Sequence, residues 1–275
     1  SGTRTYIITG GIIKGWVAGG ANGTNINEGA MTGASYIYVG GDAQINSEGS
    51  TTLINRAVGG NVFGAGCGYD ATSESGQVTL GTNVVIADNA YVERGVYGGG
   101  SYGYCPTDKT SNIYITGGIV DGKAGGVNGT SYSANIPGGV YGGACQNRGG
   151  TVNIYMTDGE INGGLYGGSN NSGTISNNVT MQINGGQVGT SGTPANIHGG
   201  GYGQATRVSG KVEVTLGATG QTTEGVEIWG DVYGGSALGH VNGTTANDTY
   251  HTYVTLNKGT INGSLYGGGL GSNDA

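Results

Sequence analysis

A short phrase recurs along the whole chain: an aliphatic residue, an aromatic ring and then two small residues, mostly glycine. Its clearest copies are Val96-Tyr97-Gly98-Gly99, Val140-Tyr141-Gly142-Gly143, Leu165-Tyr166-Gly167-Gly168, Val232-Tyr233-Gly234-Gly235 and Leu265-Tyr266-Gly267-Gly268. Two further copies keep the register with another ring, and a degenerate first copy has Val17 in place of the ring: Val62-Phe63-Gly64-Ala65, Ile197-His198-Gly199-Gly200 and Trp16-Val17-Ala18-Gly19. Such self-similarity predicts a repeat architecture.

Each copy of the phrase is preceded by alternating apolar residues that lead into a glycine. The alternation is clearest in Ile113/Ile115, Val152/Ile154/Met156, Val179/Met181/Ile183, Val212/Val214/Leu216 and Val254/Leu256. A period of two predicts a β-strand with one buried face. A second short apolar segment and an Asn-Gly or Asp-Gly turn then lead to the ring, so each unit is predicted to contain three short strands.

The spacing between the ring positions favours one β architecture over others. From Phe63 to Tyr266 the intervals are 34, 44, 25, 32, 35 and 33 residues. About 25 residues are enough for one coil of a three-sided parallel β-helix, and polar loops accommodate the excess. Propeller blades of about 40 to 50 residues are too long for several intervals. The segments beside each Asn-Gly are too unequal for two-residue hairpins. A parallel β-solenoid with a column of aliphatic residues inside is therefore predicted.

The composition limits the classes of function. Of the 275 residues 65 are glycine, but only 3 are proline and glycine does not recur at every third position, which excludes a collagen triple helix. The 10 Lys and Arg are scattered among 17 Asp and Glu, which argues against a nucleic-acid or anionic-membrane partner. No apolar stretch is long enough to span a bilayer, so no membrane insertion is expected in this segment.

Metal and cofactor sites are not expected. Cys67, Cys105 and Cys145 form no Cys-x-x-Cys pair, and the chain has only 3 histidines, so no zinc site of known spacing is present. Two coils would separate Cys67 from Cys145 by about 10 Å, beyond the reach of a disulfide, whereas a Cys105–Cys145 bridge stays open. Otherwise the three thiols are expected to be small buried residues.

The rings of the repeated phrase are the candidate binding residues. If the aliphatic residue before each ring points inward, the rings point outward on one sheet and stack at the coil spacing. They are Phe63, Tyr97, Tyr141, Tyr166, His198, Tyr233 and Tyr266. A planar ring with a polar tip suits sugar faces and protein contacts, which makes the column a candidate binding stripe. The alternative is a structural ladder, in which the rings stack on one another and cover the glycine-rich turns.

No catalytic residue is predicted. Hydrolases and lyases on β-helices need carboxylates about 5 to 9 Å apart, or a carboxylate cluster that holds Ca²⁺. Asp158 and Glu160, two apart on one strand, are the best pair, and both are interpreted as solvated turn residues. Glu213 and Glu227 are assigned to other positions within the repeat, so they are expected to lie apart from this pair.

At Val96-Tyr97-Gly98-Gly99-Gly100 and its equivalents, with an Ile-x-Gly-Gly pattern ahead of them, the sequence resembles a known type of repeat. It is similar to the glycine-rich right-handed parallel β-helix repeats of large bacterial cell-surface proteins, in particular adhesin-like proteins of Bacteroidetes. The resemblance covers essentially the whole chain. It implies an extracellular, surface-attached rod that projects or forms an adhesive surface, and it transfers no catalytic residue. Because the repeat runs through the whole chain without a concentrated polar site, the leading hypothesis is a non-enzymatic structural and adhesive protein, at the cell surface or secreted, with a glycan or a cell-surface protein as the partner.

The expected fold class is all-β, a single-stranded right-handed parallel β-helix of about eight coils with variable loops. Residues 1–275 are expected to form one such repeat domain within a longer repetitive protein. The alternative function, from a different class, is a polysaccharide lyase or glycoside hydrolase on the same scaffold.

Overall fold

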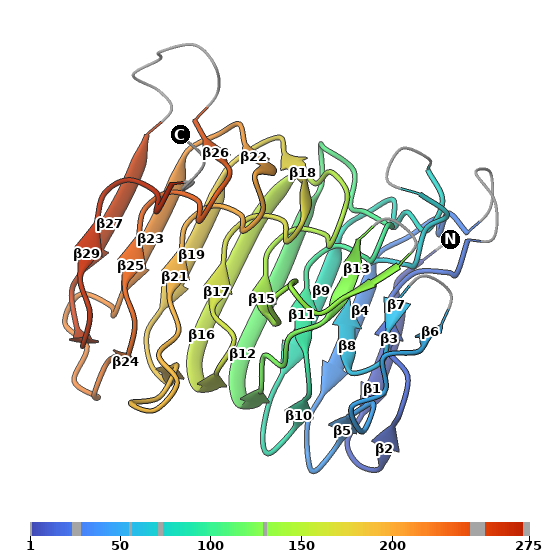
Figure 1. The fold of residues 1–275 in the computed structure, drawn as a ribbon, viewed down its shortest axis with the longest axis horizontal. Coiled ribbons are helices and arrows are strands. Elements are labelled where there is room, and N and C mark those ends of the chain that lie inside the picture. Colours follow the sequence, from blue (N-terminus) through green and yellow to red (C-terminus); the bar gives the residue numbers. More distant parts are fainter. Residues whose placement is uncertain are drawn as a thin grey trace.

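The computed structural model describes residues 2–23, 29–54, 57–70, 74–128, 131–242 and 251–271. These residues form an all-β structure without a helix, in which parallel strands of successive repeats lie side by side (Figure 1). The strands follow one another in space in the order in which their repeats occur in the sequence. The prediction of stacked parallel strands is confirmed.

Each repeat begins with its longest strand, and these first strands form the body of one sheet, here called the long-strand sheet. Their order is β1 (Arg4–Ile8), β4 (Ser35–Val39), β9 (Thr82–Ile86), β12 (Thr110–Val120), β16 (Thr151–Ile161), β19 (Val179–Ile183), β23 (Val212–Leu216) and β27 (Thr252–Leu256). The second strands extend this sheet around a corner: β2 (Ile12–Ile13), β5 (Gln44–Ile45), β10 (Tyr91–Val92), the last residues of β12 and β16, β20 (Gln187–Val188), β24 (Val226–Ile228) and β28 (Gly259–Ile261).

The third strands carry the rings and form a separate sheet of eight strands, here called the ring sheet. Its strands are β3 (Val17–Ala18), β8 (Asn61–Phe63), β11 (Gly95–Tyr97), β15 (Gly139–Tyr141), β17 (Leu165–Tyr166), β21 (Ile197–His198), β25 (Val232–Tyr233) and β29 (Leu265–Tyr266). Eight third strands in one register agree with the predicted number of repeats.

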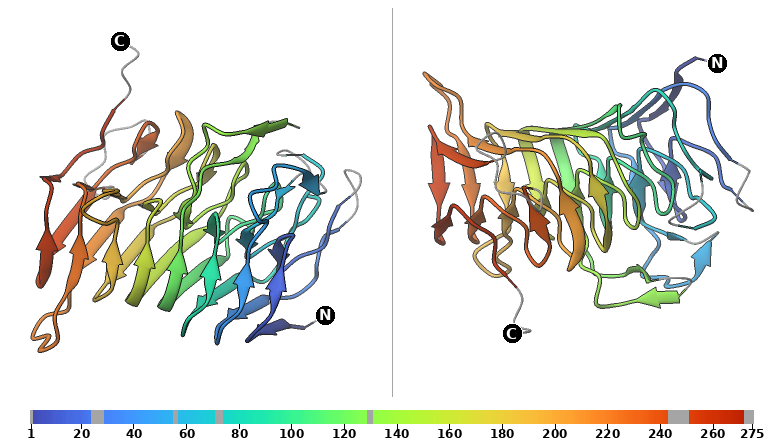
Figure 2. Two further views of the ribbon diagram at one scale, coloured as in Figure 1. Left: turned by 60° about the horizontal axis from the view of Figure 1, so that its bottom comes forward. Right: turned by 90° about the horizontal axis from the view of Figure 1, so that it is seen from above.

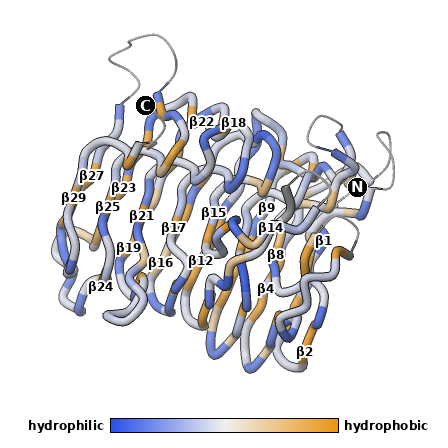
Figure 3. Tube along the Cα trace, in the orientation of Figure 1, coloured by the Kyte–Doolittle hydropathy of each residue, from blue (hydrophilic) through white to orange (hydrophobic). Residues whose placement is uncertain are grey.

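One continuous apolar core lies between these sheets. Ile113, Ile154 and Met181 pair in register along the first strands and are fully buried in it. Val140 and Leu165, which precede the rings, face the same core from the ring sheet. Figure 3 shows the apolar segments of neighbouring strands lying side by side across the stack. Since burial of an aliphatic side chain contributes roughly 1.5–3 kcal/mol, stacking supplies the stability that a single repeat lacks.

Glycine is required at two corners of the repeat for two different reasons. Gly186, after the first strand, has a φ of 80°, which favours glycine because a side chain is strained there. Gly142, directly after the ring, has no positive φ. A Cβ on Gly142 would lie 2.3 Å from the carbonyl oxygen of Gly167 in the next repeat and 2.3 Å from Val152 Cγ1. The first corner requires glycine for its backbone conformation, and the second requires glycine because no side chain fits there.

Insertions in the N-terminal half form two antiparallel hairpins outside the stack. They are β6 (Leu53–Ile54) with β7 (Ala57–Val58), and β13 (Gly126–Asn128) with β14 (Ser131–Ser133). In the right-hand view of Figure 2 these light-blue and green hairpins project from one side of the stack. Side chains from this region, including Val58 and Tyr102, form a small apolar cluster of their own.

In the C-terminal half the loop after Gly-Gly adds a strand to the stack. β18 (Ser172–Ile175), β22 (Ala205–Val208) and β26 (His240–Val241) pair in parallel. Ile175 and Val208 from these strands are fully buried in the main core. The hairpins lie between the second and third strands of their repeats, whereas β18, β22 and β26 follow the third strand, so the two halves of the chain elaborate different loops.

The ring position of the first repeat differs from the prediction. Register pairs Val17 with Val62 and Ala18 with Phe63. Val17 occupies the buried aliphatic position, and Ala18 occupies the ring position. The prediction that Val17 replaces the ring was therefore wrong by one residue, because the glycine that follows the ring position is Gly19, as Gly64 is in the second repeat.

Candidate functional site

The rings of the repeated phrase form one continuous column on the outward side of the ring sheet. Register places Tyr97 beside Tyr141, and the other members follow in the same way. From Phe63 to Tyr266, neighbouring ring centroids lie between 4.7 and 5.2 Å apart. The interplanar angle is largest, 27°, for Phe63 and Tyr97. The predicted alignment of all seven rings is confirmed.

The column is covered by other side chains, which corrects the expectation of an accessible binding stripe. Six members are buried, namely Phe63, Tyr97, Tyr141, Tyr166, His198 and Tyr233, whereas Tyr266 in the last repeat is 46% exposed. Side chains from before and after the ring strands pack on them, among them Trp16, Tyr202 and Leu238. Tyr202 lies edge-on to Tyr166 with centroids 5.8 Å apart. The six buried rings present no face to a ligand and match the structural ladder.

Hydroxyl groups of the rings form hydrogen bonds within the protein. The Tyr141 hydroxyl donates to the Pro137 carbonyl at 2.8 Å, and the Tyr233 hydroxyl donates to the Asp231 carboxylate at 3.0 Å. The Tyr97 hydroxyl accepts a hydrogen bond from the side-chain amide of Asn170 at 3.1 Å. Burial raises the pKa of Tyr97 and of Tyr141 well above the usual range, so these hydroxyls stay protonated.

His198 is the one imidazole in the column and lies between Tyr166 and Tyr233. It is 2% exposed, and its Nδ1 has no hydrogen-bond partner among the described residues. Burial lowers the pKa of His198 to about 4, although the nearby charge of Asp231 acts in the opposite direction. The imidazole is therefore neutral at neutral pH, as stacking among uncharged rings requires.

The three cysteines are buried and form no disulfide, so the Cys105–Cys145 bridge that the sequence did not exclude is not formed. Cys67 and Cys145 pack against the ring column. Burial raises the pKa of the Cys67 thiol, and it raises that of Cys105 to about 11. Within the described ranges no group of three or more His, Cys, Asp and Glu side chains is placed to hold a metal ion.

A buried pair of charged residues, Glu93 and Arg94, lies at the corner before β11. The Glu93 carboxylate accepts hydrogen bonds from the Ser47 amide at 2.6 Å and from Lys123 Nζ at 3.1 Å. Burial acts to raise the pKa of Glu93, but the hydrogen bonds from Ser47 and Lys123 outweigh it and lower that pKa. The Arg94 guanidinium donates to the Ala124 carbonyl. The pair thus fastens two long loops to the stack.

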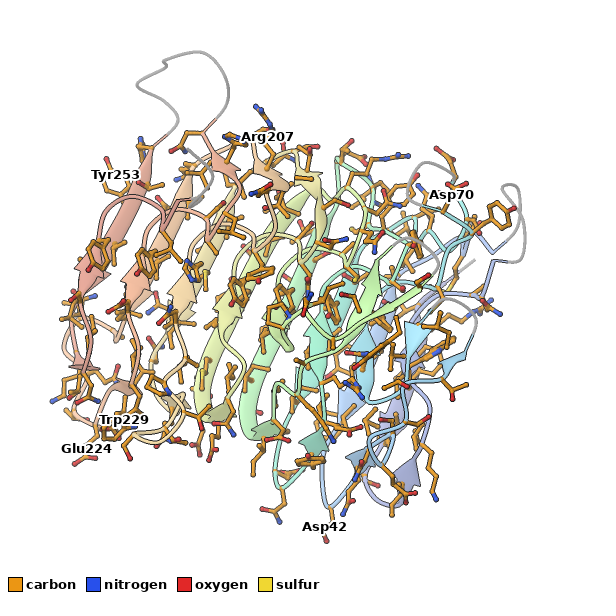
Figure 4. The ribbon with its side chains drawn as sticks, in the orientation of Figure 1. Asp42, Asp70, Arg207, Glu224, Trp229 and Tyr253 are labelled. Carbon is orange, nitrogen blue, oxygen red and sulfur yellow. The ribbon has the colours of Figure 1, made fainter. Side chains whose placement is uncertain are left out.

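The open site lies at a different corner, where the first strands meet the second strands. A hollow of about 1160 Å³, here called the corner groove, runs along this corner. Its lining residues come from five successive repeats: Asp88, Asn89, Gly118, Ile119, residues 157–160, residues 184–187, residues 218–225 and Glu227. Figure 4 places Glu224 on the lower edge of the stack.

The register brings two glutamates of the groove onto one ladder. Glu160 pairs with Gln187, and Gln187 pairs with Glu227. Two strand spacings separate the backbones of Glu160 and Glu227 by about 10 Å. The expectation that Glu227 is out of phase with Glu160 was therefore wrong. A loop of nine residues, 217–225, stands where the preceding repeat has only two, 184–185, and this insertion hides the shared phase in the sequence.

The inserted loop 217–225 forms one wall of the groove and is held in place by Gln221. The side-chain amide of Gln221 donates to the Asn184 carbonyl at 2.6 Å, and its side-chain oxygen accepts from the Ala218 amide at 2.8 Å. Gln182 donates to the Gly217 carbonyl at 3.2 Å. The bonds to Asn184 and from Gln182 tie the loop to the preceding repeat, and the bond from Ala218 braces the loop internally.

The groove is acidic. Asp88, Asp158, Glu160, Glu224 and Glu227 line it, and no Lys, Arg or His does so among the described residues. Asp88 accepts hydrogen bonds from the Gly41 amide and the Tyr38 hydroxyl, and these lower its pKa, the first more than the second.

Part of this site was predictable. Asp158 and Glu160 were recognised as the best carboxylate pair, and both line the groove. Gln187, Glu227 and the loop were missed. The difference in length between the segments after Ile183 and after Leu216 was the signal that could have found them.

Comparison with known proteins found no match: no family model fits the chain, and no curated protein and no solved structure is significantly similar to it. In the part of the chain that the structure describes, no helix has the length and apolar character needed to cross a membrane.

Proposed function

We propose that this chain is an extracellular, non-enzymatic rod with structural and adhesive roles, built as a single-stranded right-handed parallel β-helix. The observation that supports the proposal is the continuous parallel pairing of both sheets, from β1 to β27 and from β3 to β29. Backbone hydrogen bonds join every repeat to the next, and one apolar core and one ring column run through the stack. Such stacking suits a long and stiff element that holds a surface away from its anchor.

The adhesive surface is assigned to the polar outside of the rod rather than to the ring column. Because six rings of the column are covered, they stabilise the rod and leave recognition to the loops and corners. The corner groove, a hollow of about 1160 Å³, lies on that outside. The expected partner is a glycan or a cell-surface protein.

A specific observation favours one second candidate, a glycoside hydrolase. Glu160 and Glu227 lie on one ladder of an open groove with Gln187 between them. Their backbone separation of about 10 Å is close to the range of roughly 6.5–9.5 Å between the carboxyl groups of inverting glycosidases. This candidate ranks second because the same residues serve equally well as hydrogen-bond acceptors for a ligand that is not cleaved.

Two measurements on the purified chain test the proposal. Beads coated with the chain are expected to adhere to surfaces that carry immobilised glycans or cell-surface glycoproteins, and beads coated with heat-unfolded chain are expected not to adhere. Incubation with soluble polysaccharides is expected to release no new reducing ends. Release of reducing ends that is lost in Glu160→Gln or Glu227→Gln would replace the adhesive function by the hydrolase.

A further inference from the structure

We propose that the corner groove binds an uncharged polyhydroxylated chain, a neutral glycan laid along the rod, and rejects anionic polysaccharides. The proposal rests on the adhesive function proposed above and names both the surface and the ligand class. It moves recognition from the ring column, where the sequence placed it, to the corner between the first and second strands.

The length of the groove indicates a chain rather than a small molecule. Its lining runs from Asp88 in the third repeat to Glu227 in the seventh. Four strand spacings correspond to about 19 Å. A linear glycan can therefore place several sugar units in the groove and contact a different repeat with each.

The mixture of polar groups in the lining indicates hydroxyl groups on the ligand. The carboxylates only accept hydrogen bonds, the amides of Asn184 and Gln187 both donate and accept, and Thr222 and Thr223 contribute hydroxyls. A sugar hydroxyl also donates and accepts, so it can satisfy all three kinds of group. A lysine-rich peptide would bring ammonium groups that only donate, and the donors of the lining would then find no acceptor on those side chains.

The charge of the groove selects against acidic ligands. Five carboxylates line it without a lysine, arginine or histidine among the described residues. Lys211 pairs with Glu213 at 2.8 Å, and Lys258 lines an adjoining hollow that shares Glu224 and Glu227 with the end of the groove. A uronic-acid or sulfated polysaccharide would meet five like charges between Asp88 and Glu227, which disfavours both its approach and its binding.

The groove is also preorganised for an extended ligand. Gln221 fastens the wall to Asn184, so binding does not have to order this loop. Ile119, which is 38% exposed and pairs in register with Glu160, offers an apolar contact for the C–H face of a sugar ring. An acceptor beside an apolar contact is an arrangement that suits a sugar better than a simple ion.

The test is affinity electrophoresis of the full chain in native gels that contain one polysaccharide each. The neutral probes are a β-glucan, a mannan and a xylan, the anionic probe is polygalacturonate, and a parallel measurement uses poly-lysine. At least one neutral polysaccharide is expected to retard the chain, whereas polygalacturonate is expected not to. Because one hydrogen bond to a charged group contributes about 1.5–3 kcal/mol, Glu160→Gln and Glu227→Gln are each expected to weaken the apparent affinity about tenfold or more.

Two further variants separate the groove from the rest of the surface. Glu213→Gln changes a carboxylate on the outward side of the long-strand sheet, away from the groove lining, and is expected to leave retardation unchanged. Replacement of residues 217–225 by Asn-Gly, the turn of the preceding repeat, removes the wall and is expected to abolish retardation. A thermal melt shows whether this loop variant folds. If it does not fold, Glu160→Gln and Glu227→Gln alone test the groove.

The outcomes distinguish this inference from the proposed function. Retardation by no neutral polysaccharide, equal retardation by polygalacturonate, or binding of poly-lysine alone would overturn the inference. If the coated beads still adhere in that case, the adhesive rod stands with another binding surface. If a neutral polysaccharide binds in the groove and is also cleaved, the ligand class stands and the non-enzymatic function fails.

Discussion

The ring column and the corner groove both lie outside the apolar core of the same repeats, yet one is closed and the other open. Tyr141 is fully buried between stacked rings, whereas Asp158 is exposed at the groove. Side chains of the segments after Gly-Gly pack over the rings, and the loop 217–225 only borders the groove. The alternation along a strand therefore predicts the side of the sheet on which a residue lies. It does not predict whether solvent or a ligand can reach that residue.

The largest expected effect comes from removing a ring in the middle of the column. Tyr141→Ala deletes a buried side chain that stacks on two neighbours and donates to Pro137, so a loss of about 4 kcal/mol in the free energy of unfolding is expected. Glu160→Gln in the groove is the matched change on the open surface and is expected to stay within about 0.5 kcal/mol. Urea unfolding measures both, and similar values for the two would remove the distinction between the surfaces.

A smaller loss is expected at the glycine that follows the same ring. Gly142→Ala places a Cβ 2.3 Å from the carbonyl oxygen of Gly167, so the two repeats must move apart, at about 3 kcal/mol. Gly267 occupies the same position in the last repeat and has no atom within 4 Å of a Cβ. Gly267→Ala is therefore the control, with a change of less than about 0.5 kcal/mol in urea unfolding. Equal effects would contradict the close approach of neighbouring repeats.

His198 makes the stability of the ring column depend on pH. Its pKa is about 4 in the folded chain against a usual value of 6.5, so the unfolded chain takes up the proton first as the pH falls. The contribution of the neutral imidazole is complete above pH 6.5 and decreases as the pH falls toward 4, by about 2 kcal/mol at pH 5.

His198→Phe keeps a ring in the column without a titratable group. Unfolding measured from pH 7.5 to 4.5 is expected to show a flatter pH dependence for this variant than for the parent chain. His240→Phe is the control, because His240 is exposed in β26. A parent chain and a His198→Phe variant with the same pH profile would show that the imidazole is not held neutral by burial.

The smallest expected effect is at the open end of the column. Tyr266 is 46% exposed and stacks on one neighbour only, Tyr233. Tyr266→Ala is expected to cost about 1 kcal/mol in urea unfolding, well below the cost at Tyr141. A cost equal to that of Tyr141→Ala would mean that stacking alone, without burial, stabilises the column.

Much of the fold was predictable because the signals are local and repeated. The alternation in Val152, Ile154 and Met156 predicts the buried face of a strand without knowledge of any other repeat, and all three residues are buried. The phrase around Tyr97 and Tyr141 predicts the register of the ring sheet, which the pairing of these residues confirms.

The candidate site was less predictable because it depends on loops of unequal length. Asp158 and Glu160 were found from their spacing on one strand. Glu227 was assigned to another phase because the loop between β23 and β24 has nine residues where the preceding repeat has two, and only the pairing with Gln187 reveals the shared ladder. The position of Val17 in the first repeat was misjudged by one residue for a similar reason, since no ring marks that position.

The sequence by itself determined the repeat, its three main strands and the ladder of the rings from Phe63 to Tyr266, because hydrogen bonding between similar units keeps them in register. Only the tertiary structure decided which outward surface is closed. Whether the segment after Gly-Gly covers Tyr141 or the loop after Leu216 borders Glu227 depends on contacts with neighbouring repeats, and no periodicity encodes them. Burial of the rings and exposure of the groove follow from those contacts.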